Sequence, residues 1–392
     1  MRWVTLEKSF RIVLFVLYFV CCPAESLFAN ELKLEPALSL AGGYNDNLFW
    51  EKNGKVGDAV VKIHPDLKLD YRSEVSHISS LFSFDFFGYA DEKELNDIKS
   101  AYQLAGDFQG SEKWSSEIES SFIKDTTLDS YLEETGRVIR REDHDLYKIG
   151  GTVAYAMFIR SSIACSYNYL NSSYSDPDFF DYNQHSVFLS YRHRMTNEID
   201  TLSIDPAYSY TKTGWNNTEN LSLSMGWTRK LTEVFYARMM IGLRHTVVSY
   251  DNSSEDDDYQ GAKALFDLTW NRAERIRIKI NYFHDLRTTV DGDVINTDNV
   301  YLKYDHSLTY YWGVGISGRL INSYQLTSSV ADKSRTIYYQ IEPHVYYHLT
   351  ETSSLIFYYR YQNSYDDSLK NNKEVECNSV WLEFQIGFPV EL

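Results

Sequence analysis

Apolar and polar residues alternate one by one along most of this chain, from about residue 34 to its end. Leu221, Leu223 and Met225, for example, are separated by the single residues Ser222 and Ser224. Because successive side chains of a β-strand point to opposite faces, this pattern predicts strands with one apolar and one polar face. The fold class is therefore all-β, and the candidates are a sandwich, a propeller or a barrel.

We identify eighteen alternating segments, whose ends are set to within about 2–4 residues. Sixteen strands is the alternative count. The approximate spans are residues 34–49, 59–72, 76–90, 99–110, 114–125, 145–159, 162–173, 184–194, 201–213, 219–229, 233–249, 260–271, 275–288, 298–311, 313–326, 335–348, 353–364 and 378–390.

The links between these segments alternate in length. Links after even-numbered segments are short, as at 73–75 and 160–161, whereas links after odd-numbered segments are longer and more polar, as at 126–144 and 251–258. This pattern is typical of an antiparallel up-and-down transmembrane β-barrel, with short periplasmic turns and long extracellular loops. A soluble sandwich or propeller is the alternative. Tyr, Phe and Trp near the strand ends favour the barrel, because they suit an aromatic girdle.

The first 29 residues are predicted to be a signal peptide. Arg2, Lys8 and Arg11 precede the apolar run 12–22, and a cleavage site is expected before Asn30. An uncleaved anchor is the alternative. We assign residues 1–29 to the signal peptide and residues 30–392 to the barrel, and we expect no plug domain before the first strand. The two cysteines of the mature chain are expected to stay unpaired.

Two features fit an ideal barrel less well. Proline cannot donate a hydrogen bond to a strand ladder, yet Pro36, Pro65, Pro206 and Pro343 all lie inside predicted strands. We expect bulges or rim positions there. The last strand has the expected alternation, but the chain continues through a proline to Leu392 instead of ending in the usual aromatic residue.

These residues give the chain a family resemblance. The opening strand 38–49 (LSLAGGYNDNLF), the proline-containing strands and the short Arg-, Thr- and Glu-rich turns resemble the β-barrel porin type 2, or OmpL-like, family. The resemblance implies an outer-membrane protein associated with exopolysaccharide export. It implies no catalytic residues.

Enzyme chemistry is not expected. The chain has no Gly-x-Ser-x-Gly elbow, no glycine-rich phosphate loop and no Cys-x-x-Cys pair. Asp143, His144 and Asp145 resemble an acid–base cluster, but a solvated charged loop is the simpler explanation. The acidic loop 251–258 has oxygen ligands that suit Ca²⁺, although it too is explained as a solvated loop. We therefore predict no catalytic residue, no cofactor and no bound metal.

The lumen is where function is expected. Eighteen strands leave an aqueous channel unless a loop folds inward, and 126–144 is the longest candidate. Among the charged residues that the alternation places on the lumen wall, the basic ones cluster toward the short turns. The alternation assigns twelve such pore-lining charges. They are Arg192, Arg194, Arg238, Arg244, Arg275, Arg277, Lys279, Lys303, Asp85, Asp205, Asp267 and Asp305.

Such charges either set ion selectivity, in this case for anions or acidic sugars, or only pair across strands and solvate the wall. Tyrosines with the same orientation offer faces for sugar rings or pack near the rims. They are Tyr236, Tyr301, Tyr311, Tyr338 and Tyr346.

We therefore expect a porin-like channel in the cell outer membrane, either for passive diffusion or as the outer-membrane part of exopolysaccharide secretion. The alternative is a closed structural or adhesion barrel that binds through its extracellular loops. Expected partners are outer-membrane lipid and lipopolysaccharide, the barrel assembly machinery and polysaccharide export components. Nucleic acid is not expected, because 55 acidic residues outnumber 38 basic ones.

Overall fold

The computed structural model describes residues 31–232, 234–251, 256–272, 275–326, 334–367, 373–388 and 390–391. The predicted signal peptide, residues 1–29, lies outside them. The strands are β1 (Glu31–Asn45), β2 (Asp58–Arg72), β3 (Ser76–Tyr89), β4 (Asp97–Gln109), β5 (Trp114–Thr126), β6 (Asp143–Phe158), β7 (Ser161–Tyr174), β8 (Tyr182–Arg194), β9 (Asp200–Lys212), β10 (Asn216–Thr232), β11 (Phe235–Tyr250), β12 (Asp257–Arg272), β13 (Ile276–Thr288), β14 (Val294–Ser307), β15 (Trp312–Gln325), β16 (Arg335–His348), β17 (Ser353–Asp367), β18 (Lys373–Gly387) and β19 (Val390–Glu391).

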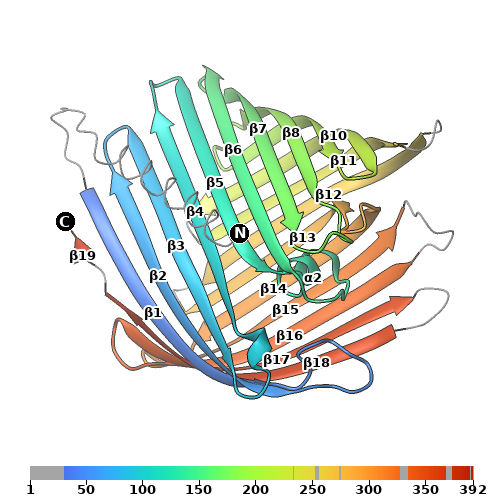
Figure 1. The fold of residues 1–392 in the computed structure, drawn as a ribbon. Coiled ribbons are helices and arrows are strands. Elements are labelled where there is room, and N and C mark those ends of the chain that lie inside the picture. The colour runs from blue at the N-terminus through green and yellow to red at the C-terminus, as the bar shows by residue number, and fades with distance from the viewer. Residues whose placement is uncertain are drawn as a thin grey trace.

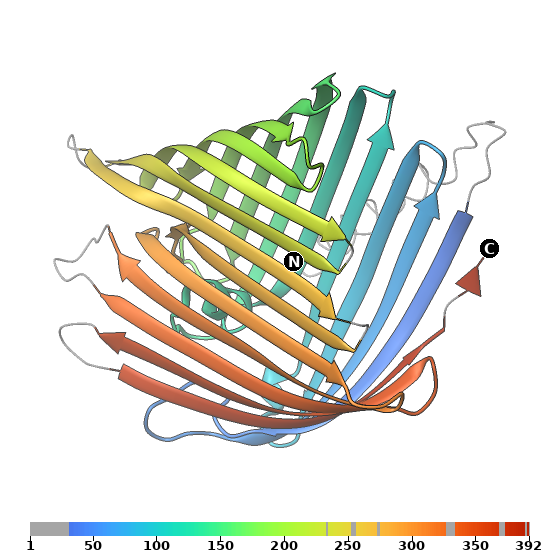
Figure 2. The same ribbon diagram turned by 180° about the vertical axis from the view of Figure 1, so that it is seen from behind.

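The strands form one closed antiparallel barrel. Each strand from β1 to β18 pairs with its neighbours in chain order, and β1 pairs with β18 to close the ring, for example through Leu40 and Phe384. The two-residue β19 pairs with the start of β1. Figures 1 and 2 show the ring from two sides, with the strands strongly tilted. The predicted eighteen-stranded up-and-down barrel is confirmed.

The strand ends differ from the expected ones at a few places. β1 ends at Asn45 rather than at residue 49, and β14 lies four residues earlier than predicted. In both cases the apolar–polar alternation of the sequence continues past the end of the strand, into residues that form a loop or a turn. Residues 46–57 fold inward as a loop, and 308–311 form a tight turn in which Leu308 and Thr309 donate backbone hydrogen bonds to Trp312.

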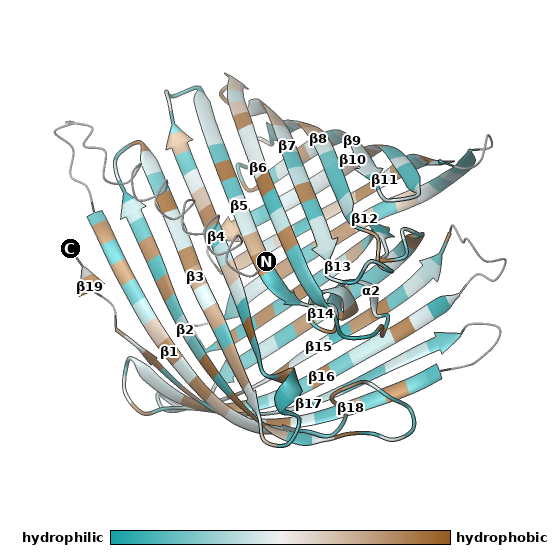
Figure 3. Ribbon diagram, viewed as in Figure 1, coloured by the Kyte–Doolittle hydropathy of each residue, from teal (hydrophilic) through white to brown (hydrophobic). Residues whose placement is uncertain are grey.

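The outer face of the barrel is apolar. Leu223, Ile241 and Leu243, on the neighbouring strands β10 and β11, are 53%, 64% and 75% exposed. Figure 3 shows the alternating apolar and polar bands along the strands. Apolar patches this continuous are rare on proteins surrounded by water, and burial in lipid stabilises them by about 25 cal/mol for each Å². The barrel is therefore of the kind that spans the bacterial outer membrane.

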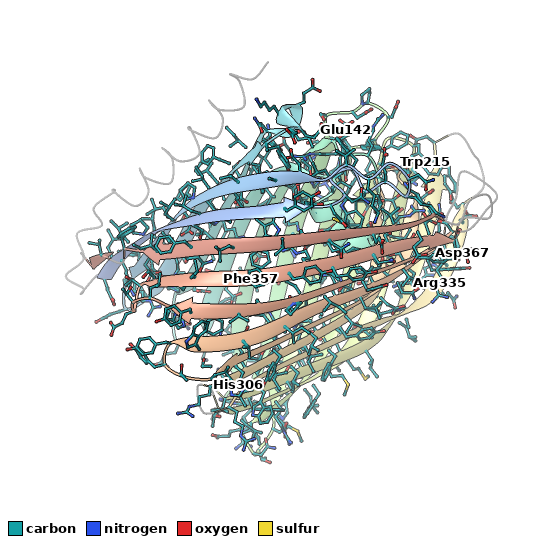
Figure 4. All side chains as sticks on the ribbon, turned by 90° about the horizontal axis from the view of Figure 1, so that it is seen from below. Glu142, Trp215, His306, Arg335, Phe357 and Asp367 are labelled. Atoms are coloured by element: carbon teal, nitrogen blue, oxygen red, sulfur yellow. The ribbon has the colours of Figure 1, made fainter. Side chains whose placement is uncertain are left out.

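Aromatic residues border this apolar face at the short-turn end. Trp114 packs on Tyr155 with ring centroids 4.6 Å apart, and Trp312 packs on Tyr347 at the same distance. These rings lie at or near the ends of their strands, as an aromatic girdle requires. Figure 4 marks the two ends of the barrel: His306 lies near the short turns, and Arg335 and Asp367 lie at the long-loop end. In the described residues, no helix is long and apolar enough to cross a membrane.

The expectation of bulges at the prolines is wrong. The strand pairs at Pro65, Pro206 and Pro343 keep one register on both sides of the proline and lack only the local bridges there. Each of these prolines faces outward in mid-strand. The missing N–H therefore interrupts the ladder on one side without shifting the strands.

Candidate functional site in the barrel lumen

Residues 127–142, here called the crossing segment, connect β5 and β6 and fold into the lumen. They contain the short helix α2 (Ser130–Thr135), which ends at Gly136 in a left-handed conformation with φ 74°. On the side of β4 and β5, Asp129 accepts from Lys99 Nζ at 2.6 Å and from Thr126 Oγ1 at 2.5 Å. Figure 1 shows α2 inside the ring of strands.

The far end of the crossing segment is held by β15–β17. Arg319 Nη1 contacts Glu133 Oε2 at 2.5 Å, Ser323 Oγ donates to Thr135 O at 2.5 Å, and Ser364 Oγ donates to Gly136 O at 2.8 Å. In a closed ring of eighteen strands, β15 lies nearly opposite β5 and β6. The segment therefore spans the lumen, as expected for 126–144.

An apolar cluster supports this arrangement. Its buried members come from residues 46–57, from the crossing segment and from the wall, and they are Trp50, Leu132, Ile321, Tyr338, Val375 and Cys377. An added Cβ at Gly136 would lie 2.8 Å from Tyr338 Cβ, so only glycine lets the backbone approach the wall this closely. Burying Leu132 and Tyr338 completely keeps the segment in place without water beneath it.

Electrostatics also hold the segment. Asp129 lies outside the membrane-spanning strands. Burial would raise the pKa of this carboxyl group, but Lys99 and the hydrogen bonds from Thr126 outweigh that effect and lower the pKa below its usual value. Asp129 is therefore ionised at neutral pH and attracts Lys99 across the inner wall.

His144 belongs to this anchor rather than to an acid–base cluster with its sequence neighbours. Strand alternation turns Asp143 and Asp145 to the other face. His144 instead lies 3.0 Å from Asp125 Oδ1 and 2.8 Å from Ser172 Oγ, and its Nδ1 is 3.0 Å from Ser130 Oγ of α2. Ser172 is fully buried, and this chain of contacts ties α2 to the wall.

A cavity of about 770 Å³ lies beside the crossing segment. Tyr131 and Glu134 of α2 form part of its lining. The wall contributes many hydroxyl and amide side chains, among them Gln103, Ser121, Asn168, Ser186, Ser209 and Asn220. Charged side chains such as Lys148 and Asp285 and apolar ones such as Leu146 and Phe188 complete the lining.

Eleven of the twelve predicted pore-lining charges face the lumen. Their strand positions share a face, through alternation and register, with residues that line the cavity or hold the crossing segment. Arg275 is the exception, because it precedes β13 and lies exposed in the β12–β13 turn. Its predicted place on the lumen wall stays a prediction.

The predicted charges differ in how they are paired. Arg244 contacts Asp285 at 3.2 Å and Asn296 at 2.8 Å near the long-loop end, away from the other basic residues. Asp85 contacts Lys62 and His64, and Asp305 contacts Lys303 and His344. Asp205 accepts from two serines, and Asp267 accepts from an asparagine. These groups fit the expectation of charges that solvate and stabilise the wall.

A second set keeps its charge open to the lumen. Among the described residues, no carboxylate lies within the 4.0 Å of an ion pair from Arg192, Arg194, Arg238, Arg277 or Lys279. Arg192 and Arg194 donate only to Ser190 Oγ and Ile159 O. Together with Lys303, which is paired with Asp305, they form the basic wall, which runs over β8–β14 near the short turns.

The sequence analysis missed an opposing acidic wall. Asp107 on β4 and Glu117 and Glu119 on β5 are exposed inside the barrel near the short turns. In the ring of eighteen strands, β4 lies opposite β13 and β5 opposite β14. The alternation that identified Lys279 and Lys303 also places these carboxylates inward, so the signal was present in the sequence.

The five predicted tyrosines have different places. Tyr236, Tyr301 and Tyr346 face the lumen, and the Arg319 guanidinium lies over the Tyr301 ring. Tyr338 is fully buried under the crossing segment. Tyr311 lies in the turn that follows β14 and packs near Tyr347 of the girdle. The last two are therefore unavailable as lumen surfaces.

Metal binding finds no support in the described residues, where no group of three or more His, Cys, Asp or Glu is arranged to hold an ion. Part of the acidic loop 251–258 lies outside them. Cys165 faces outward on β7, whereas Cys377 is buried on β18, and both thiols are free.

No family model matches the chain, and no curated protein matches it. Solved structures are similar in fold at low identity. OccK9 (OpdG) from Pseudomonas aeruginosa is 12% identical over 91% of this chain and 98% of that chain, with a TM-score of 0.46. The outer membrane protein OpdK of the same organism is 10% identical over 91% and 99%, with a TM-score of 0.45.

OccAB3 from Acinetobacter baumannii is 10% identical over 92% of this chain and 99% of that chain, with a TM-score of 0.47. A similarity with these identities and TM-scores concerns the fold alone. The resemblance to the OmpL-like family is not confirmed and stays a prediction.

Proposed function

We propose that this barrel is an outer-membrane channel for small hydrophilic solutes, and that the crossing segment sets the width of its bore. The observation that carries this proposal is a cavity of about 770 Å³, bordered by many polar and charged side chains, beside a segment that is anchored to opposite walls. A barrel meant only as a scaffold has no need of a polar interior of this volume, because side chains can fill smaller barrels completely.

The charged walls support the same proposal. Arg277 and Lys279 on β13 lie across the ring from the acidic wall on β4 and β5, so a solute near the short turns experiences a field across the lumen. Dipolar and charged solutes orient in such a field. The expected anion preference is therefore moderated by the acidic wall.

The test is single-channel conductance of the refolded mature chain in a planar bilayer, with the variants Gly136→Ala and Gly54→Ala. Both glycines have left-handed φ angles, but only the Cβ at residue 136 meets the wall. We expect Gly136→Ala to displace the crossing segment and to raise the conductance roughly twofold, with Gly54→Ala unchanged. Folding of each variant is checked by the mobility of unheated protein on a denaturing gel.

A silent wild-type barrel that is shown to be folded would refute the channel. It would instead favour the structural or adhesion barrel, because residues 46–57 and the crossing segment already close part of the long-loop end. A role in exopolysaccharide export is the narrower proposal, supported only by the family resemblance. Loss of exported polysaccharide in a deletion strain, restored by wild type but not by a folded variant with a blocked lumen, would test it.

A further inference from the structure

We propose that three aromatic side chains on the lumen wall, His344, Tyr358 and Trp381, form a platform that binds the flat faces of neutral sugar rings. The inference rests on the proposed channel function and names a solute class for it. It is independent of the basic wall, which lies on other strands.

The three side chains form one continuous row across the sheet. His344 on β16 is the register partner of Tyr358 on β17, which is the partner of Trp381 on β18. Gly315 and Gly43 are the next partners on either side, on β15 and β1. Five neighbouring strands at about 4.8 Å spacing give the row a length of roughly 19 Å.

The glycines at the two ends let the rings lie flat against the wall. A Cβ added to Gly43 would lie 2.5 Å from a Trp381 ring atom, and one added to Gly315 would lie close to His344 Nε2. Trp381 therefore leans over β1, and His344 leans over β15. Tyr358 lies nearly parallel to Trp381, with an interplanar angle of 14° and centroids 6.3 Å apart.

A fourth ring extends the platform toward the short turns. Tyr346 follows His344 on the same face of β16 and leans over Gly313 in the same way. The two rings are stacked, with an interplanar angle of 29°. All four side chains are partly buried against the wall and keep part of their surface exposed, which for His344 is 14%.

Polar groups border the rings above and below. Glu342 and Arg360 form an ion pair at 2.5 Å on one side, and Glu383 accepts from Gln385 at 2.7 Å on the other. A cavity of about 410 Å³ adjoins the platform there and is lined by Glu383, Gln385 and His64. Sugar rings combine an apolar C–H face with hydroxyl groups at the edge, which these surroundings can match.

Local charge favours neutral sugars over anionic ones. Arg360 is neutralised by Glu342, and His344 lies 3.1 Å from Asp305 Oδ1. Glu383 adds a carboxylate, so an acidic sugar is repelled from this part of the wall. Aromatic rings over glycines also stabilise β-sheets without any ligand. A binding role can be told apart from this stabilising role, because only binding requires contact between the sugar and the exposed surfaces of the rings.

The experiment measures transient current blockades by maltohexaose in the planar bilayer, with polyethylene glycol of similar size as the control for simple obstruction. The variants are Trp381→Ala, Gly43→Ala and the matched control Gly42→Ala, since a Cβ at residue 42 meets no atom within 4 Å. We expect maltohexaose binding to weaken roughly tenfold in the first two and to stay unchanged in the third. The Gly43 and Gly42 pair keeps the test valid if Trp381→Ala does not fold.

A conducting wild type with no blockades, or with equal blockades in Gly43→Ala, would overturn the platform and leave the channel intact. If the folded barrel does not conduct, the proposed function fails, and tryptophan fluorescence on maltohexaose addition decides the platform. A fluorescence change that occurs in wild type and in Gly42→Ala but not in Gly43→Ala supports the platform. No change in wild type overturns it.

Discussion

Arg192 and Arg194 illustrate what a single residue contributes to this lumen. Both are exposed, face inward near the short turns and contact no described carboxylate. Arg229 provides a comparison, because it faces outward and both of its contacting nitrogens bind the carboxylate of Asp200 at 2.8 Å. The same residue type is therefore open on one face of the barrel and neutralised on the other.

Neutralising Arg192 and Arg194 should reduce the preference of the channel for anions. In a tenfold salt gradient, we expect the reversal potential of the Arg192→Gln, Arg194→Gln double variant to shift toward cations by roughly 5–10 mV, out of about 59 mV for perfect selectivity. Glu117→Gln should shift it the other way. Arg229→Gln is the control. A shift of equal size in that control would mean that the effect does not arise in the lumen.

Alternation was sufficient to predict which way most charges point, but not which partners they have. The contact of Asp125 with His144 depends on the register between β5 and β6, which no local pattern encodes. Arg275 shows a related limit, because periodicity does not indicate that β13 begins only at Ile276. The platform of His344, Tyr358 and Trp381 also depends on register over four strand pairs.

At the scale of an element, the crossing segment is the part of the molecule most sensitive to its surroundings. Its ion pairs with Lys99 and Arg319 lie inside the lumen at opposite walls. A carboxyl group with a lowered pKa stabilises the folded state above its unfolded pKa, and this contribution is lost as the pH falls through the folded value.

Acid should therefore release one end of the segment. Because the pKa of Asp129 is lowered from a usual value near 4, its contribution is complete at neutral pH and disappears only below about pH 4. We expect channel conductance to rise in that range, and Asp129→Asn to show a raised conductance already at pH 7 with a weaker acid response. Asp91→Asn, in the β3–β4 loop where the side chain is exposed and forms no ion pair with a described residue, serves as the control. An acid response identical in all three proteins would exclude Asp129 as its origin.

Eighteen strands were predictable from the sequence because each one repeats the same two-residue pattern. The inward course of residues 46–57 and of the crossing segment was harder to predict, since loops have no comparable period. The length of 126–144 identified one of them as a candidate. The other carries Trp50, which directly follows the predicted first strand 34–49 and is buried in the lumen against Tyr338.

For the whole molecule, the orientation in the membrane is testable at the two ends of one strand. β8 begins after a long loop that contains Asp178 and ends at the turn 195–199. We expect an epitope inserted at Asp178 to bind antibody on intact cells, and one inserted at 197 to bind only after the outer membrane is permeabilised. The reverse result would mean that the barrel lies in the membrane in the opposite orientation. Equal antibody access at both sites would argue against a membrane-spanning wall.

The anchors of the crossing segment also have a consequence for the order in which the barrel is completed. Glu133 and Arg319 are separated by 186 positions in the chain, and Gly136 and Ser364 by 228. The segment belongs to the first half of the chain, but its distal contacts exist only once β15–β17 are in place. Contacts so distant in sequence form late. Each newly made barrel therefore passes through a stage in which its wall is nearly finished and its lumen is not yet narrowed.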